Sequence, residues 1–392
     1  GLLDMKYNLS DICDYAKGKV NVASLGYESY ISTENMISNK GGITKASSLP
    51  SVAQTQSFQA GDVLVSNIRP YFKKIWFAEF NGGCSNDVLV LRAKDGISKR
   101  FLYYVLTDDT FFNYSMITSK GTKMPRGDKT AIMKYEIPYF TYEEQEKIAG
   151  VLEALDKKIQ LNTDINDNLQ QQLRAIFKGR FTDNPELERM TQIPLSELCH
   201  VVTKGTTPTT LGKPFVGSGI NFIKAESILD NHSIDKSKFA FIDEKTNTLL
   251  KRSVIQSGDV VFTIAGTLGR FALIDENVLP ANTNQAVAII RVDTEKVLPE
   301  YVYTCFIGGW HTDYYAKRVQ QAVQANLSLT TIKSLPIPVL DEDKMPDYLR
   351  LILPIIKAIK ENEEQSERLA ALRDVLLPKL MSGEVDVSDI RL

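Results

Sequence analysis

Two stretches of the chain, residues 141–182 and 341–385, place apolar residues at alternating steps of four and three. In the first stretch this heptad seam consists of Ile148, Leu152, Leu155, Ile159, Leu169, Leu173 and Ile176, with Asn162 and Asn166 at its two polar positions. A heptad sustained over about four repeats is typical of a helix that pairs with another helix. Each stretch is therefore predicted to form one long helix.

The second stretch repeats the register of the first, 200 residues later. Its seam consists of Tyr348, Ile352, Ile355, Ile359, Asn362, Ser366, Leu369, Arg373 and Leu376. Residues 193–340 must leave the end of the first helix and return to the start of the second, and the ends of a compact domain usually lie close together. We therefore expect an antiparallel pair, with its register fixed by the mid-length polar residues Asn162, Asn166, Asn362 and Ser366.

The regions outside these helices, residues 1–140 (module 1) and 193–340 (module 2), are related as a repeat. Residues 9–13 return as residues 195–199, and residues 61–64 return as residues 258–261. Both modules mix short β-rich runs with amphipathic helical stretches. The β-rich runs are residues 62–66, 88–91, 259–264 and 286–291, and the helical stretches are residues 99–106 and 299–307.

These patterns together predict a mixed α/β protein with an internal pseudo-twofold repeat. Two globular domains are separated by two long antiparallel coiled-coil helices. The predicted parts are residues 1–140 (first globular domain), 141–182 (first helix, a spacer), 193–340 (second globular domain) and 341–385 (second helix, a spacer).

Composition excludes several classes of protein. The 392 residues are 43% hydrophobic and 24% charged, which is ordinary for a soluble globular protein and not for a disordered one. The chain has no apolar run long enough for a membrane span and no signal-peptide pattern near its start, so we expect a cytoplasmic location. Four widely separated cysteines and three histidines predict buried thiols and no metal site.

Motifs for enzymatic chemistry are missing from the sequence. No GxxxxGK[ST] phosphate loop, GxSxG nucleophile turn or HExxH zinc motif occurs. Residues 266–270, Gly-Thr-Leu-Gly-Arg, are interpreted as a tight turn. We therefore predict no catalytic residue and no cofactor bound by this chain.

Features suited to a polyanion are better represented. Lys and Arg can neutralise phosphates, while Gln and Asn can read adenine edges with two hydrogen bonds. In each module a basic or amide-rich loop lies at the same position of the repeat, although each cluster alone could be a solvated surface loop. The predicted DNA-binding residues are Arg69, Lys73, Lys74, Lys123 and Arg126 in module 1, and Lys204, Thr206, Arg270, Lys317, Gln321, Gln324 and Asn326 in module 2.

Several segments resemble the specificity subunit of type I restriction–modification systems. They are Glu-Glu-Gln-Glu-Lys-Ile-Ala at residues 143–149, Leu-Arg-Asp-Val-Leu-Leu-Pro-Lys-Leu-Met-Ser-Gly-Glu at 372–384, and the shorter segments 204–208, 219–224 and 266–271. The resemblance covers essentially the whole chain, including the order module, helix, module, helix.

This resemblance implies a function for each part. Each module would be a target recognition domain that reads one half of a bipartite sequence in double-stranded DNA. The helices would set the gap and dock two modification (methyltransferase) subunits, which bind S-adenosylmethionine and methylate adenine. Restriction (endonuclease/translocase) subunits, which use ATP and magnesium, would join to cut DNA. The chain itself would be non-catalytic.

Two other classes of function stay open at this point. A coiled-coil protein-interaction scaffold would not read DNA, and charge reversal at Lys123 and Arg126 would leave its function unchanged. A divergent methyltransferase would transfer methyl groups without partners. The matched basic and amide-rich loops favour DNA recognition over the scaffold, and the missing cofactor loops disfavour the enzyme.

Overall fold

The computed structural model describes residues 6–184, 190–312, 314–315 and 327–387. The chain forms two compact units, residues 1–161 with 365–392 (unit 1) and residues 162–364 (unit 2). Each unit contains one globular module and part of both long helices. Among the described residues, the model contains no helix with the length and apolar character needed to cross a bilayer.

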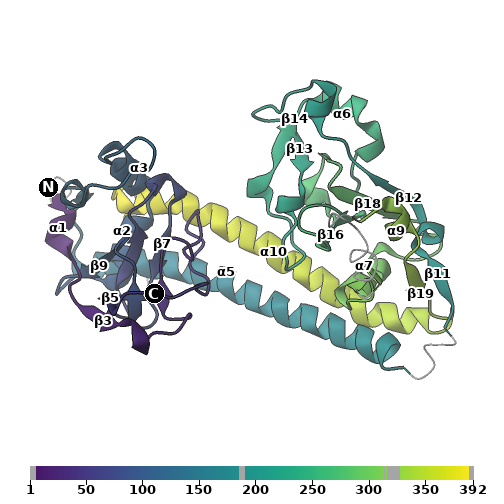
Figure 1. Ribbon diagram of the computed structural model, residues 1–392, viewed down its shortest axis with the longest axis horizontal. Helices are drawn as coiled ribbons and strands as arrows, with labels where there is room; N and C mark the ends of the chain where they lie inside the picture. The colour runs from purple at the N-terminus through teal and green to yellow at the C-terminus, as the bar shows by residue number, and fades with distance from the viewer. Residues whose placement is uncertain (1–5, 185–189, 313, 316–326, 388–392) are drawn as a thin grey trace. The chain divides into compact units, whose positions relative to one another are not determined.

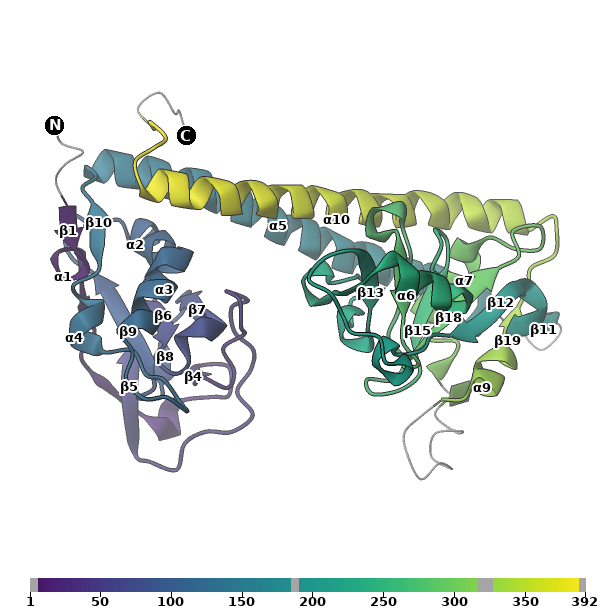
Figure 2. The same ribbon diagram turned by 90° about the horizontal axis from the view of Figure 1, so that it is seen from above.

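Module 1 in unit 1 is built from three antiparallel or mixed sheets. In chain order its strands are β1 (Lys6–Asn8), β2 (Cys13–Tyr15), β3 (Lys19–Asn21), β4 (Tyr30–Ile31), β5 (Gln54–Phe58), β6 (Val63–Ser66), β7 (Ile75–Phe77), β8 (Gly82–Cys84), β9 (Val88–Ala93) and β10 (Glu136–Pro138). The sheet orders are β2-β9-β6-β7, β3-β5-β8-β4 and β1-β10. The described α-helices of the module are α1 (Leu9–Ile12), α2 (Lys99–Thr107), α3 (Asp109–Ile117) and α4 (Lys129–Ile132) (Figures 1 and 2).

Module 2 in unit 2 repeats this plan. Its strands are β11 (Gln192–Pro194), β12 (Cys199–Lys204), β13 (Ile220–Ile223), β14 (Ala240–Ile242), β15 (Val260–Thr263), β16 (Phe271–Leu273), β17 (Ala281–Thr283), β18 (Val287–Val292) and β19 (Pro336–Pro338). The sheet orders are β12-β18-β15-β16, β14-β13-β17 and β11-β19. Its described α-helices are α6 (Glu244–Leu249), α7 (Pro299–Ile307) and α9 (Leu329–Lys333).

The repeat extends to buried ion pairs inside the four-stranded sheets. Asp62, which precedes β6, binds Arg92 of β9 at 2.7 Å. Asp259, which precedes β15, binds Arg291 of β18 at 2.7 Å. Both carboxylates are almost fully buried, so each pair ties the start of a central strand to its neighbour. The predicted α/β repeat is confirmed, and the short strands and helices predicted inside the two modules begin and end within two residues of those observed. The second long helix is shorter than predicted, Met345–Met381 instead of residues 341–385.

The two long helices are α5 (Tyr142–Phe177), which continues into a π-helical turn at Lys178–Thr182, and α10 (Met345–Met381). They run side by side in both views (Figures 1 and 2). In unit 2, Asn162 Nδ2 donates to the carbonyl of Asn362 at 3.3 Å, and Asn362 Nδ2 donates to Asn166 Oδ1 at 2.8 Å. Asn166 Nδ2 donates to the carbonyl of Ile359 at 3.1 Å. These contacts show the antiparallel pairing and bring the three asparagines together, while Ser366 is half-buried on α10. That these four residues set the register stays a prediction.

The apolar seam has a second role that the heptad pattern did not indicate. In unit 1, Ile148 and Leu152 of α5 belong to the core of module 1, and Leu376 of α10 packs against that core. In unit 2, Leu173 and Ile352 belong to the core of module 2. The same stripe therefore packs one helix on the other and both helices on a module, because it is wide enough to face two neighbours.

Candidate nucleic-acid interface

Three segments of module 1, residues 36–42, 67–74 and 117–126, come together through backbone hydrogen bonds. We call this surface the three-loop face. The amides of Asn39 and Lys40 donate to the carbonyls of Phe72 and Lys73, both at 2.8 Å. The amide of Arg69 donates to the carbonyl of Pro125 at 2.8 Å. The structure thus joins two of the predicted basic segments and adds residues 36–42, which sequence reasoning missed.

The backbone of this face is strained in the left-handed region. Positive φ angles occur at Asn39 (56°), Lys40 (61°), Arg69 (50°) and Lys73 (49°). Among the described residues, His232 is the only other non-glycine residue with a positive φ. Such conformations cost about 1–3 kcal/mol each and cluster at functional sites, where surrounding contacts hold them. Here the hydrogen bonds between segments 36–42 and 67–74 provide those contacts.

The charge of the three-loop face is entirely positive. Its segments contain seven cationic residues and no acidic one: Lys40, Arg69, Lys73, Lys74, Lys120, Lys123 and Arg126. Neighbouring carboxylates position some of them, since Lys40 and Lys73 both bind Asp109 at 2.9 Å, and Arg126 binds Asp87 at 3.2 Å. Burial alone would raise the pKa of Asp109, but these two ammonium groups lower it. The carboxylates orient cations without cancelling the excess charge.

The predicted residues of module 1 have different surroundings within this face. Lys123 is exposed, and Arg126 is 57% exposed beside Asp87. Lys74 Nζ donates to the carbonyl of Thr33. Arg69 is half-buried, and its Nε lacks a hydrogen-bond partner, as does the buried Asn67 Oδ1 nearby in the same loop. An unsatisfied buried group costs about 1–3 kcal/mol, which hydrogen bonds to an incoming ligand would offset.

Module 2 has the same pair of loops. The amide of Gly127 donates to the carbonyl of Asn67 at 3.1 Å in module 1, and the amide of Leu327 donates to the carbonyl of Ile264 at 2.9 Å in module 2. In each case the connection between two sheet strands meets the segment that precedes α4 or α9. Four predicted residues lie outside the described residues: Lys317, Gln321, Gln324 and Asn326.

The guanidinium group of Arg270 is largely occupied by contacts within the protein. Its guanidinium binds both oxygens of Asp230, at 2.6 and 2.7 Å, and donates to the carbonyl of Ile228. Its side chain is 23% exposed. Arg270 directly precedes β16, as Lys74 directly precedes β7. Each donates to a loop carbonyl of its own module, Arg270 to that of Ile228 and Lys74 to that of Thr33. The structure therefore gives both residues a loop-holding role, and their contact with DNA stays a prediction.

Lys204 and Thr206 lie at the end of β12, where Lys204 is exposed and Thr206 is half-buried. Arg252 lies beside Lys204 in the structure, and its Nη2 donates to the carbonyl of Lys204 at 3.5 Å. Lys251 and Arg252 are both exposed, and sequence reasoning missed them. The two basic residues are adjacent in the sequence, which could have drawn attention to them. However, Arg252 is 48 residues from Lys204, and no local pattern links the two places.

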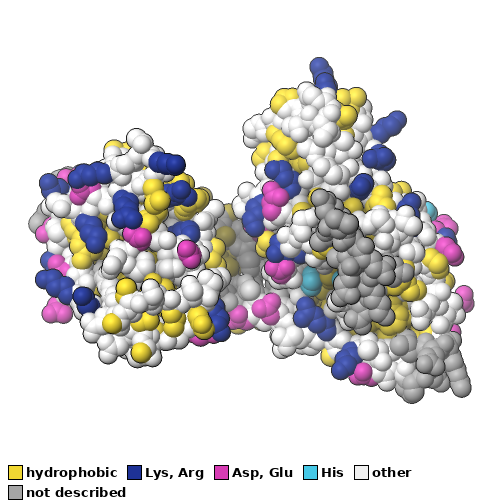
Figure 3. All heavy atoms as spheres, viewed as in Figure 1, with side chains coloured by type: hydrophobic (Ala, Val, Ile, Leu, Met, Phe, Trp, Pro, Cys, Tyr) yellow, Lys and Arg dark blue, Asp and Glu magenta, His cyan; other side chains and the backbone are white. Residues whose placement is uncertain are grey.

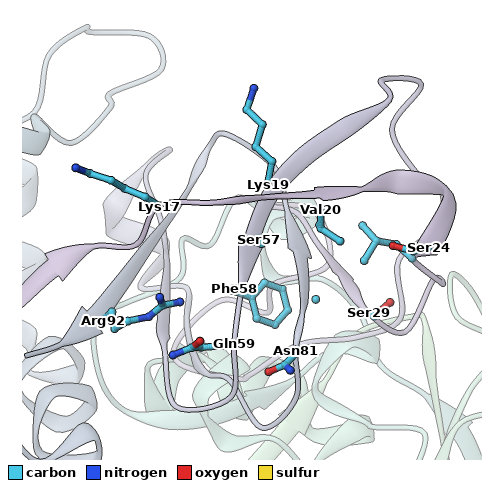
Figure 4. A pocket seen from close by; sticks show the side chains of 12 residues that line it. Lys17, Lys19, Val20, Ser24, Ser29, Ser57, Phe58, Gln59, Asn81 and Arg92 are labelled. Carbon is cyan, nitrogen blue, oxygen red and sulfur yellow. The ribbon is translucent and has the colours of Figure 1, made fainter.

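Basic side chains also occur elsewhere, so charge alone does not define a site. Figure 3 shows Lys and Arg on the visible face of each unit, with acidic groups among them. A hollow of about 460 Å³ in module 1 is lined by Lys17, Lys19, Phe58 and Arg92. In Figure 4, Lys17 and Lys19 extend away from Phe58, and Arg92 is bound by Asp62. This hollow therefore has no free cation directed inward among its labelled residues.

Ionisable groups suited to catalysis are not assembled in the described residues. Burial raises the pKa of the Cys13, Cys84 and Cys199 thiols to about 12, so they are protonated at neutral pH. Burial lowers the pKa of His232 and His311 to about 4, so both are neutral. No group of three metal-ligating side chains occurs in the part of the chain that the structure describes.

A family model for the type I restriction modification DNA specificity domain matches the chain twice, over residues 4–171 and 188–345. The chain belongs to this family. Each match covers one module, and the first extends along α5 while the second ends at the first residue of α10. The chain is therefore a non-catalytic DNA-recognition component of a type I restriction–modification system.

Individual relatives agree with the family match. The chain is 24% identical to the type I restriction enzyme HindI specificity subunit of Haemophilus influenzae, and the alignment covers 97% of this chain and 99% of that protein. It is also 24% identical to the MjaIX specificity subunit of Methanocaldococcus jannaschii, over 76% of this chain and 71% of the relative. The crystal structure of the S subunit from M. genitalium has the same fold, with a TM-score of 0.55, 17% identity and 96% coverage of both chains.

Proposed function

We propose that each module reads one half of a bipartite sequence in double-stranded DNA. The observation that carries this proposal is the recurring loop pair, Asn67 with Gly127 and Ile264 with Leu327. The framework is the same, but the first loop of the pair differs: residues 67–74 contain three cations and two aromatic residues, whereas residues 264–270 contain two glycines and Arg270. One framework with different contact side chains is suited to two different half-sites.

We further propose that α5 and α10 set the gap between the half-sites and dock two modification subunits. Both helices contribute residues to both units. Each also exposes large apolar side chains at helical spacing, Leu161 and Ile165 on α5 and Leu372 and Val375 on α10. Exposed apolar side chains one helical turn apart are suited to contact with a partner protein. S-adenosylmethionine, ATP and magnesium would bind to the modification and restriction subunits, and this chain would hold no cofactor.

Charge reversal on the three-loop face tests the DNA contact. The change is Lys123→Glu with Arg126→Glu, and the matched control is Lys17→Glu with Lys19→Glu, two exposed lysines of the same module outside the face. In the complex with the modification subunit, we expect the first pair to weaken DNA binding at least about a hundredfold and to flatten its salt dependence, because two phosphate contacts are lost. The control should bind within about threefold of the unchanged chain. Equal behaviour of both pairs would support the scaffold function instead.

The spacer proposal has a separate test. Insertion of seven residues into both helices, at the level of Leu161 in α5 and Gln365 in α10, lengthens each by about 10 Å while nearly preserving rotational phase. We expect the gap in the methylated sequence to grow by about three base pairs, at ~3.4 Å per base pair, with both half-sites unchanged. An unchanged gap would exclude the spacer role.

A further inference from the structure

The three-loop face combines its positive charge with an unusual amount of exposed apolar surface. Eight large hydrophobic side chains are exposed among the described residues of module 1, and five of them belong to this face: Ile37, Tyr71, Phe72, Ile117 and Met124. Single exposed apolar residues need no explanation, but a cluster indicates a binding surface. The ligand must therefore offer both negative charge and an apolar region.

Ile117 and Met124 are the most exposed side chains of the cluster. Ile117, the last residue of α3, is 85% exposed, more than any other large hydrophobic residue that the structure describes. Met124 is 49% exposed and lies in a turn closed by reciprocal backbone hydrogen bonds between Lys120 and Arg126, both 2.9 Å. Met124 therefore lies in a closed turn, between Lys123 and Arg126 in the sequence.

The charge favours DNA over a protein as the ligand. Five of the seven cations on the face are lysines, and the core of protein–protein interfaces is depleted in lysine. In a DNA duplex the large apolar surfaces are the faces of the stacked bases, which become accessible only where a base step opens. Isoleucine and methionine are among the side chains that proteins insert between base steps, with phosphate contacts on either side.

We propose that Ile117 and Met124 form an apolar wedge that opens a base step in the half-site of module 1. The inference rests on the proposed function and adds a mode of recognition to it. Lys123 and Arg126 hold the backbone beside the opened step, and the energy needed to unstack it depends on the step's sequence. The wedge therefore favours easily deformed pyrimidine–purine steps, without hydrogen bonds to their bases.

The test uses the chain in complex with its modification subunit and DNA whose half-sites have been mapped by methylation of a random library. The fluorescent base 2-aminopurine, which brightens on unstacking, is placed at successive positions of both half-sites. We expect a severalfold rise in 2-aminopurine fluorescence at one base step of the half-site read by module 1. This position is distinct from the adenine extruded for methylation, where the fluorescence also rises. Ile117→Ala with Met124→Ala should abolish that rise and weaken binding about tenfold, while the rise at the methylated adenine remains.

Two further variants control for folding and for chemistry. Val52→Ala removes an exposed apolar side chain of module 1 outside the face and should change nothing. Met124→Leu keeps an apolar tip and should keep the rise. The fluorescence of Trp76 in the core of module 1 reports whether the double variant is folded.

Several outcomes would overturn the wedge. No rise outside the methylated adenine, in a complex that methylates a split sequence normally, would reject the wedge and leave the proposed function intact. Loss of assembly with the modification subunit in the double variant, with fluorescence rises unchanged, would make the cluster a protein interface. A library that yields no split sequence would reject the proposed function, and the wedge with it.

Discussion

The two units attach their modules to the same pair of helices by different chemistry. In unit 1, Asp156 of α5 binds Arg373 of α10 at 2.8 Å and accepts a hydrogen bond from Tyr104 of α2 at 2.8 Å. At the equivalent places 200 residues away, unit 2 has the buried apolar residues Ile356 and Leu173. The junction between module and helices is therefore polar in unit 1 and apolar in unit 2.

The space at the junction differs as well. In unit 1 a pocket of about 450 Å³, open to solvent, lies between residues 39–42, α2, α5 and α10. In unit 2 the corresponding loop reaches the helix directly, since Gln170 Nε2 donates to the carbonyl of Asn231. The half-buried His232 of the same loop stacks on Phe271, with ring centroids 4.0 Å apart. Gly308 lies so close to Phe177 that an added Cβ would be 2.1 Å from the ring. The two units thus share a fold but differ in the residues at the module–helix junction. We expect substitutions at this junction to destabilise unit 2 more than unit 1.

Removal of the aromatic ring at the junction of unit 2 should have the largest effect. Phe177→Ala should lower the free energy of unfolding of unit 2 by about 3–5 kcal/mol, because the closely packed surroundings cannot fill the cavity. The chain has two tryptophans, Trp76 in unit 1 and Trp310 beside Phe177, so each unit can be followed with the other tryptophan changed to Phe. A loss below about 1 kcal/mol in urea unfolding would contradict the tight packing of this junction.

A fall in pH should lower the free energy of unfolding of unit 2 more than that of unit 1. All three histidines lie in unit 2, and the folded-state pKa values of His232 and His311, about 4, lie below the ordinary 6.5. The unfolded unit therefore binds more protons between pH 6.5 and 4, and its stability falls as the pH falls through this window. We expect a loss of about 1–3 kcal/mol by pH 5.5.

The measurement is the urea midpoint of each unit at pH 7.5 and 5.5, followed through Trp310 and Trp76 separately. His232→Phe with His311→Phe should remove most of the pH dependence of unit 2. Parallel shifts of both midpoints would show that the histidines do not account for the difference between units.

The polar junction of unit 1 can be converted into the apolar one. Arg373→Leu alone should cost about 1–3 kcal/mol, because it leaves the half-buried Asp156 without its cation. Asp156→Ile with Arg373→Leu installs the residue types of unit 2, and we expect its stability to return to within about 1 kcal/mol of the unchanged chain. A double variant less stable than Arg373→Leu would mean that the surrounding junction, Tyr104 included, requires the charges.

The smallest effect is expected in the polar layer of the helix pair. Asn162→Leu with Asn362→Leu should raise the thermal stability of unit 2 by about 1–2 kcal/mol while loosening the helix register, since polar seam residues cost stability and specify alignment. Differential scanning calorimetry measures the first effect. Methylated sequences with more than one gap length would show the loosened register. An unchanged thermal stability together with an unchanged gap length would show that the polar layer does not control alignment.

The sequence predicted the long helices, their register and the repeat, because these follow from local periodicity and from matching segments. It did not predict the third loop of the interface. Asn39 and Lys40 adopt left-handed conformations, and their amides donate to the carbonyls of Phe72 and Lys73, more than 30 residues away. Likewise, the ion pair with Asp230 that occupies Arg270 depends on a loop 40 residues distant. Such contacts are set by tertiary structure, for which one sequence carries no periodic signal.

The most direct measurement is a map of the adenines methylated in a random-sequence DNA library by this chain with its modification subunit and S-adenosylmethionine. The account predicts a split motif, with two short fixed blocks of different sequence around a gap of constant length. Different blocks are expected because the two modules present different side chains on one framework. A single contiguous motif would contradict the account, since one module would then read no DNA and the repeat would be purely structural.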